Sequence, residues 1–294
     1  VTLIQEVGFP IAAALGLGWF IYKLIMRIVD GMETKLDTVD EKVEGQISAL
    51  EERLGTKLTS NLSDLRAEHH FECLRDWNVF HNILDVKKWY ELQRKSCTME
   101  VQKIPVKDCK DWVIDESKGD ISHVSGEFFS IHGLRINSDN REVGRGGWDQ
   151  PILTQVGNDG GILGLVRKRF EGIPHYLVEA KAEPGNYGML QLSPTLQATF
   201  SNLKRAHKGK RPLFADIFEE PDSIGAEVLY DQWLSEDGGR LFLKRNRGML
   251  VEVPHSVIEE IPNGFIWLSM WQIKELLHED AWVNPHIRGI ISNL

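Results

Sequence analysis

The chain has 294 residues, of which 42% are hydrophobic and 26% are charged, and its formal net charge is −9. This is the composition of a folded chain of one or two domains. The negative charge argues against nucleic acid as a main partner, because binding to phosphates needs a basic face. The three cysteines show neither a metal-binding nor a disulfide spacing, which favours a reducing compartment.

Residues 1–29 are predicted to contain a membrane-spanning helix at 7–29. An uncharged run starts at Val7, and snorkelling of Lys23 and Arg27 extends it to the length that a bilayer requires. A cleaved signal peptide would have positive charge before the run, whereas here a glutamate precedes it. Positive charge after the run predicts a single-pass protein whose C-terminal domain is cytoplasmic. The opening motif VGFPI resembles small holin-like and YvrJ-type membrane peptides.

The next segment, residues 30–69, is predicted to be a self-associating coiled-coil rod. Its apolar residues recur with a 3-4-4 spacing, an eleven-residue period, and the stripe continues backwards into the spanning helix. A single helix cannot bury such a stripe by itself, so we expect a parallel homo-oligomer formed through residues 14–65. The alternative is a helix packed on its own domain. The pattern leaves the number of copies open.

Residues 70–100 are predicted to be a helical connector, and residues 101–294 a domain of short strands and few helices. The candidate strands, separated by Gly, Pro, Asn and Asp, are 124–131, 151–156, 161–167, 174–181, 226–233, 240–244 and 249–253. A helix is expected at 269–280, with Ser269 as its N-cap and Gln272 completing a capping box. Mixed strands with few helices indicate an α+β or a mixed α/β fold.

A dense set of polar side chains lies between residues 146 and 202, at the ends of short apolar runs. Amide, hydroxyl and carboxylate groups placed beside glycine or proline in this way are typical of a small-molecule pocket. The set consists of Trp148, Asp149, Gln150, Lys181, Glu183, Asn186, Gln191, Ser193, Thr195, Gln197, Thr199 and Asn202. Structural alternatives remain: Asp149 could cap a turn, Lys181 and Glu183 could form an ion pair, and the strand at 191–202 could line the core.

Six blocks of this sequence, in order, resemble the NDP-hexose 2,3-dehydratase family. They are SGEFFSIHGLRI (125–136), GGWDQPIL (146–153), KAEPGN (181–186), QLSPTLQATFSN (191–202), SEDGG (235–239) and GFIWLSMWQIKELL (264–277). The resemblance implies a Nudix-like module and a nucleotide-linked 4-keto-6-deoxyhexose as substrate. The familiar enzymes are soluble and carry this module twice, whereas here one copy follows a membrane-type segment.

The resemblance also implies a reaction and a set of roles. The 4-keto group acidifies the C3 proton, and the enolate formed on its removal expels the C2 hydroxyl, with no redox cofactor or metal required. A base, hydrogen-bond donors to the enolate oxygen and an acid are needed. The candidates are Glu183 or Asp149 as base, His132 or Lys181 as acid, and Gln191, Ser193, Thr195 or Gln197 as donors. Glu236 and Asp237 could contact ribose hydroxyls or lie in a solvated turn.

Two classes of function follow from these patterns. One is a membrane-anchored, self-associating sugar-nucleotide 2,3-dehydratase, a carbon–oxygen lyase of deoxysugar synthesis. The other is a receptor without catalysis, in which the domain binds a nucleotide ligand and the rod gates or disrupts the membrane. The unbroken stripe from span to rod favours the receptor, and the intact family blocks favour the enzyme, so catalysis itself is left open at this point.

Overall fold

The computed structural model describes the following residues: 19–32, 35, 42, 64–137, 146–158, 160–204, 210–236 and 239–294. The chain divides into two units, Val1–Asp64 and Leu65–Leu294. In the first unit residues 19–32 are helical. The predicted span at 7–29 is described only in this helical part, and most of the predicted rod lies outside the described residues. No helix within the described ranges has the length and apolar character needed to cross a bilayer.

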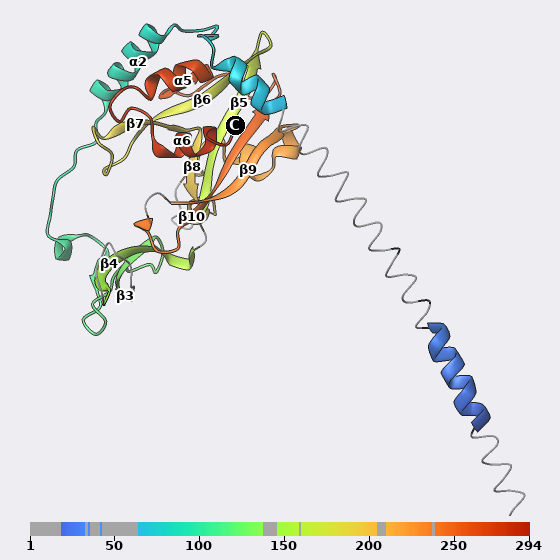
Figure 1. The fold of residues 1–294 in the computed structure, drawn as a ribbon. Helices are drawn as coiled ribbons and strands as arrows, with labels where there is room; N and C mark the ends of the chain where they lie inside the picture. The colour runs from blue at the N-terminus through green and yellow to red at the C-terminus, as the bar shows by residue number, and fades with distance from the viewer. Residues whose placement is uncertain are drawn as a thin grey trace, which may run out of the picture. The chain divides into compact units, whose positions relative to one another are not determined.

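The second unit contains two β-sheets and several short helices (Figure 1). A small antiparallel sheet has the order β1 (Trp112–Ile114), β2 (Ile121–His123), β3 (Phe129–Ile136), β4 (Trp148–Gln155). The large sheet is built from β5 (Gly161–Phe170), β6 (Ile173–Ala182), β7 (Leu190–Pro194), β8 (Leu196–Thr199), β9 (Glu227–Ser235), β10 (Arg245–Val253) and β11 (Phe265–Leu268). The helices are α2 (Ile83–Ser96), α3 (Phe200–Leu203), α4 (Ala215–Glu219), α5 (Met270–Leu276) and α6 (Pro285–Ile291). The mixed α/β class indicated by the sequence is confirmed.

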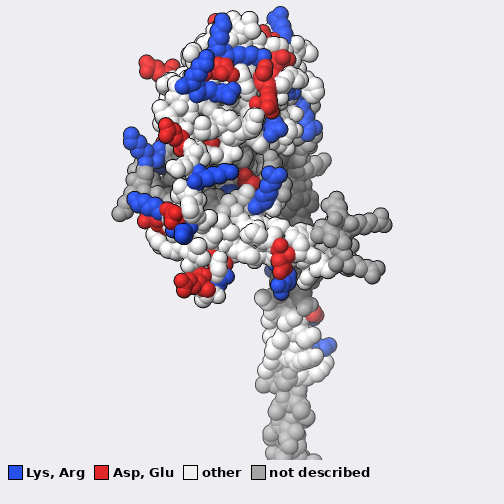
Figure 2. Space-filling view, turned by 90° about the vertical axis from the view of Figure 1, so that its left-hand side faces the viewer, with Lys and Arg blue, Asp and Glu red and all other residues white. Residues whose placement is uncertain are grey.

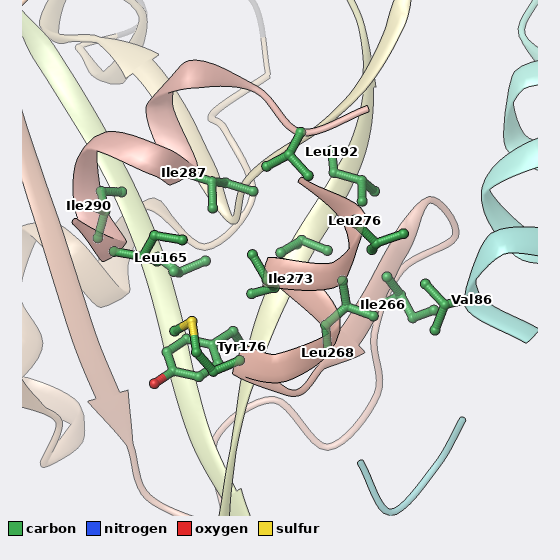
Figure 3. Close-up of a cluster of buried hydrophobic side chains, with 14 of the residues drawn as sticks. Val86, Leu165, Tyr176, Leu192, Ile266, Leu268, Ile273, Leu276, Ile287 and Ile290 are labelled. Carbon is green, nitrogen blue, oxygen red and sulfur yellow. The ribbon is translucent and has the colours of Figure 1, made fainter. Parts of the chain in front are cut away.

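The large sheet is buried on both faces, because alternate residues of its central strands enter two separate hydrophobic clusters. Leu163 and Leu165 of β5 belong to the cluster covered by α2, α5 and α6, part of which Figure 3 shows. Ile162 and Val166 belong to the cluster covered by α3 and α4. Successive side chains of a strand point to opposite faces, so one strand supplies both clusters. Neither face of β5 is therefore free to carry a site at its centre.

The hairpin formed by β5 and β6 opens part of the way along. The two strands pair directly only from Phe170 and Ile173 to Val166 and Leu177. Beyond that point β7 pairs with β6 and β8 pairs with β5, so the segment β7–β8 occupies the space between them. We call this arrangement the fork, and Thr195, between β7 and β8, lies at its apex.

Residues 64–72 are helical and attach to the large sheet through a buried charged network. Arg167 on β5 is 1% exposed and forms ion pairs with Glu68, with Glu72 at 3.0 Å and with Glu252 of β10 at 3.0 Å. The Tyr176 hydroxyl donates to Glu72 at 2.8 Å. A buried charge needs such compensation, since an unpaired one is costly.

The expected helical region after residue 70 is interrupted. The helix containing residues 64–72 ends there, and α2 begins only at Ile83. Between them the carbonyl oxygen of the Asn78 side chain accepts hydrogen bonds from the backbone N–H groups of Phe80 and His81. These bonds hold the chain in a turn, which competes with a continuous helix.

The strand expected at 240–244 is absent, since the described residues of this segment form a bridge and a turn ahead of β10. By contrast, the capping box at Ser269 and Gln272 is present as predicted, and α5 ends at Leu276.

Candidate functional site

Four of the predicted residues come together at the open end of the fork. The side-chain amide of Gln197 on β8 donates to one carboxylate oxygen of Glu183 at 2.9 Å. The amide of Asn186 donates to the other oxygen at 3.0 Å. Lys181, two residues before Glu183, places its ammonium 3.4 Å from the backbone carbonyl oxygen of Gln197. We call Lys181, Glu183, Asn186 and Gln197 the fork cluster.

The geometry of the fork cluster follows from its backbone. Glu183 comes directly after β6, and its N–H donates to the Met189 carbonyl at 2.9 Å while its own carbonyl accepts from the Asn186 N–H at 3.1 Å. This tight turn brings the Asn186 amide back onto the Glu183 carboxylate. Both carboxylate oxygens accept amide hydrogen bonds, so the group is fixed in orientation and can serve as a positioned base.

Glu179 is a member of this site that the sequence reasoning missed. One of its oxygens lies 3.7 Å from the Lys181 ammonium. Burial raises the pKa of the Glu179 carboxyl, Lys181 opposes this, and the charge of Glu183 adds to it. The signal that could have identified it is its spacing, because Glu179 and Lys181 are alternate residues of β6 and their side chains therefore lie on the same face of the strand.

Ser193 lies next to Glu179 on the neighbouring strand. The two residues are directly opposite each other in the β6–β7 register. Ser193 is completely buried, and within the described part of the chain its hydroxyl has no hydrogen-bond partner. Buried hydroxyls are rarely left unpaired, so Ser193 is an unusual feature beside Glu179.

Two other predicted residues of the same segment are held by protein groups. The Gln191 amide donates to the Ala281 carbonyl at 2.9 Å and its oxygen accepts from Asn284 at 3.3 Å. Thr195 bonds to the backbone at the apex of the fork. Their polar character has a structural explanation, since a strand that changes partners leaves backbone groups that a side chain must satisfy.

Thr199 and Asn202 lie at the far end of β8. Thr199 is the N-cap of α3, where its hydroxyl accepts from the Asn202 N–H at 3.3 Å. It also lies 2.9 Å from the Ser201 hydroxyl. Thr199 therefore caps the N-terminus of α3, and Asn202 is exposed.

The remaining predicted residues before β5 lie on the small sheet. Asp149 forms an exposed bidentate pair with Arg135, at 3.0 and 2.9 Å, beside a surface hollow of about 430 Å³. The indole of Trp148 donates to Gln150 at 2.7 Å. His132 contacts the Thr154 hydroxyl at 3.1 Å. This group is on a different sheet from the fork cluster, and the structure does not bring the two together.

Glu236 belongs to a third group, centred on a buried lysine. The Asn246 amide donates to Glu236 at 2.6 Å, and Lys244 donates to Asn246 at 2.8 Å and to Gln155. Burial lowers the pKa of Lys244, and the charge of Glu236 opposes this shift. Asp237 lies outside the described residues.

This third group adjoins the fork cluster through one residue. Glu236 and Asn246 line a small cavity of about 40 Å³ together with Leu163. Leu163 is in turn the direct partner of Gln197 across the β5–β8 pair. One strand, β5, therefore separates Gln197 of the fork cluster on β8 from Asn246 of the Lys244 network on β10.

The electrostatic character of the surface is mixed. Figure 2 shows lysine and arginine side chains interspersed with acidic ones on the face it displays. No cluster of three or more histidine, cysteine, aspartate or glutamate residues that could hold a metal ion occurs among the residues described. The groups gathered at the fork are instead two carboxylates, one ammonium and two amides, which can move protons and stabilise an anion.

Comparison with known proteins gives a consistent result. A family model described as NDP-hexose 2,3-dehydratase matches residues 84–294. The relatives found are named dTDP-4-dehydro-6-deoxy-alpha-D-glucopyranose 2,3-dehydratase. The protein from Amycolatopsis orientalis is 38% identical over 215 residues, which cover 71% of this chain and 44% of the relative. That from Streptomyces violaceoruber is 38% identical over 206 residues, covering 70% and 45%.

A third relative, from Saccharopolyspora spinosa, is 39% identical over 200 residues, which cover 66% of this chain and 38% of the relative. The chain thus spans less than half the length of the relatives it matches. The matched residues include the whole large sheet with the fork cluster. Since the family model covers most of the chain, the protein belongs to the NDP-hexose 2,3-dehydratase family.

Proposed function

We propose that this chain catalyses the 2,3-dehydration of dTDP-4-dehydro-6-deoxyglucose. The observation that carries this proposal is the fork cluster, in which a carboxylate is fixed by two amides beside an ammonium group. The three relatives bear the name of this activity. We also propose that the large sheet with its helices is the Nudix-like module implied by the family resemblance.

Glu183 is the base in this proposal. The 4-keto group of the sugar makes the C3 proton acidic, and a carboxylate held in place by Gln197 and Asn186 is suited to remove it. Asp149, the other predicted base, is exposed and paired with Arg135 on the small sheet. Glu183 therefore has the better orientation and the less solvated setting.

Lys181 is the group that stabilises the enolate. Removal of the C3 proton places negative charge on the C4 oxygen, and a nearby ammonium lowers the energy of that state. Among the described residues, the contacts of the Lys181 ammonium are long, at 3.4 Å to the backbone carbonyl oxygen of Gln197 and at 3.7 Å to a carboxylate oxygen of Glu179. It can therefore turn to a substrate oxygen without breaking a strong hydrogen bond. His132, predicted as an alternative acid, lies on the small sheet.

A direct test is to incubate the full chain with dTDP-4-dehydro-6-deoxyglucose, reduce the keto groups with borohydride and follow the loss of one water by mass spectrometry. Glu183→Gln keeps the size of the side chain and the reach of its oxygen, and it is expected to lower the rate by about 10² to 10⁴. Glu227→Gln, an exposed position on β9, is the matched control. A wild-type chain that leaves the substrate intact would contradict the proposal.

A receptor function is the second candidate, and one observation favours it. The helix at 64–72 is joined to β5 and β10 by the buried network around Arg167, so a displacement of that helix would be transmitted to the sheet. Tight binding of dTDP-4-dehydro-6-deoxyglucose without loss of water would support this alternative. We keep the membrane anchor and the rod as proposals that rest on the sequence pattern.

A further inference from the structure

The proposed dehydration requires an acid as well as a base, because the C2 hydroxyl must leave as water. Glu183 cannot donate this proton at the start of the reaction, since it has to be ionised to remove the proton at C3. Lys181 is needed as a cation beside the enolate oxygen. Glu179, 3.7 Å from the Lys181 ammonium, is a further titratable group beside the fork cluster.

We propose that Glu179 is the general acid that protonates the C2 hydroxyl as it leaves. This inference rests on the proposed dehydratase function. Glu179 and Lys181 are alternate residues of β6 and lie on one face of it, and Glu183 follows the end of that strand. Along the chain, the ammonium therefore has a carboxyl group two residues away on each side. One oxygen of Glu179 lies 3.7 Å from the Lys181 ammonium, so both groups are close enough to contact one bound sugar.

The surroundings of Glu179 differ from those of Glu183. Glu183 accepts hydrogen bonds from two amides. Glu179 lies between Phe265 of β11 and Ser193 of β7, its direct partners across the sheet. An apolar ring and a buried hydroxyl favour the neutral carboxylic acid, and burial raises the pKa of this group. Two carboxyl groups in such different settings are the usual arrangement for an acid and a base.

Ser193 supports the same assignment. Its hydroxyl is completely buried and unpaired among the residues that the structure describes. It lies directly opposite Glu179 in the register of the two strands. Because solvent does not reach Ser193, this side of Glu179 is dry, which favours the neutral carboxylic acid over the ionised form.

The proton balance closes over one turnover. Glu183 takes the C3 proton, and the electron pair is first held in the enolate that Lys181 stabilises. That electron pair then forms the C2–C3 double bond as the C2–O bond breaks, and the Glu179 carboxyl gives its proton to the departing hydroxide. Water and an enol are formed. Glu183 then returns its proton to C2, while Glu179 takes the proton of the C3 hydroxyl, which gives the 3,4-diketone and restores both carboxyl groups.

Deuterium exchange separates the two steps. The full chain is incubated with dTDP-4-dehydro-6-deoxyglucose in deuterium oxide, and both water loss and deuterium at C3 of the remaining substrate are measured. Glu179→Gln should lower the rate of water loss by about 10² or more but still exchange the C3 proton, because the base is intact. Glu183→Gln should abolish exchange and water loss together. Glu179→Asp keeps an acid and should recover part of the water loss.

The outcomes distinguish the inference from the function on which it rests. A wild-type chain that neither exchanges nor dehydrates overturns the dehydratase function itself. If the wild type is active, a Glu179→Gln variant that dehydrates normally, or that loses exchange as well while still binding dTDP, overturns only the role of Glu179. The exposed Glu227→Gln variant controls for loss of one carboxylate from the sheet and should match the wild type in both measurements.

Discussion

The hydroxyl of Thr195 donates a hydrogen bond to the carbonyl oxygen of Leu177 at the apex of the fork. The same hydroxyl accepts a hydrogen bond from the N–H of Val166 at 2.9 Å. Val166 and Leu177 are the last residues that β5 and β6 pair with each other. A single buried side chain thus forms hydrogen bonds to both strands where the hairpin opens. The segment β7–β8, which carries Gln197, is inserted at this point.

Replacing Thr195 by valine should destabilise the domain. The substitution keeps the shape but leaves the Val166 N–H and the Leu177 carbonyl without their partner in a site that is 2% exposed. The expected loss in the free energy of unfolding is about 2–4 kcal/mol, measured by urea denaturation. Thr195→Ser keeps the hydroxyl and should lose about 1 kcal/mol for the methyl group. Equal stability of the valine and serine variants would refute this account.

The charged network around Arg167 should be sensitive to removal of the arginine. Arg167→Met leaves the buried Glu72 without its cation, whereas Glu68 and Glu252 keep their ion pairs with Arg169, and the expected loss is about 3–5 kcal/mol. Glu72→Gln retains an acceptor for Arg167 or Tyr176 and should cost less. Urea unfolding of the two variants gives the comparison. If Arg167→Met were as stable as the wild type, the network would be dispensable for attaching residues 64–72.

His69 should make the stability of the domain depend on pH. Burial, with a smaller contribution from nearby cations such as Lys274, lowers the pKa of His69 to about 4. The pKa of His69 is lower in the folded state than its unfolded value of 6.5, so the folded state favours the neutral imidazole. This contribution to stability is present above pH 6.5 and is lost as the pH falls towards 4. Between pH 7 and pH 5 the loss should be about 2 kcal/mol.

The test compares urea unfolding of the wild type and of His69→Gln at both pH values. The variant should lose this part of the pH dependence. His70 is the adjacent and exposed histidine, so His70→Gln should keep the wild-type behaviour. A pH dependence that survives in His69→Gln would show that another group is responsible.

Lys244 should be important for joining the small sheet to the large one. Its ammonium donates to Gln155, at the end of β4, and to Asn246 of β10. Lys244→Met leaves two buried amide oxygens unpaired, at a cost of about 1–3 kcal/mol for each. Hydrogen exchange of the β4 amides should therefore become faster. Lys118→Met, at an exposed lysine of the β1–β2 turn, should leave these amides unchanged.

The sequence was informative where local chemistry decides the structure. The capping box at Ser269 is a short-range pattern, and α5 begins there as predicted. The expected strands at 161–167 and 174–181 lie within β5 and β6, because β-branched and aliphatic residues with flanking turns have few alternatives. The break between residues 72 and 83 was missed, since it depends on the side chain of Asn78 bonding to the backbone beyond it.

The candidate site could be predicted only in part. Lys181, Glu183, Asn186 and Gln197 were all expected to be functional, and the structure gathers them. Gln191 and Thr195 carry similar polar groups but are held by the protein, Gln191 by Ala281 and Asn284 and Thr195 by the backbone at the apex of the fork. A pattern of alternating residues cannot reveal these partners. Glu179 was missed because its raised pKa depends on burial by segments distant in the sequence. The ligand-binding roles of the other predicted residues stay predictions.

The inserted segment β7–β8 has a practical consequence for engineering. Because β6 ends at Ala182 and β7 starts at Leu190, the turn between them projects beyond the paired strands. Tyr187 in this turn is 73% exposed, so a change of its side chain should leave the pairing of β6 with β7 intact. A library randomised at Tyr187 and nearby positions, with Glu183 and Asn186 retained, should therefore be screened for altered sugar preference.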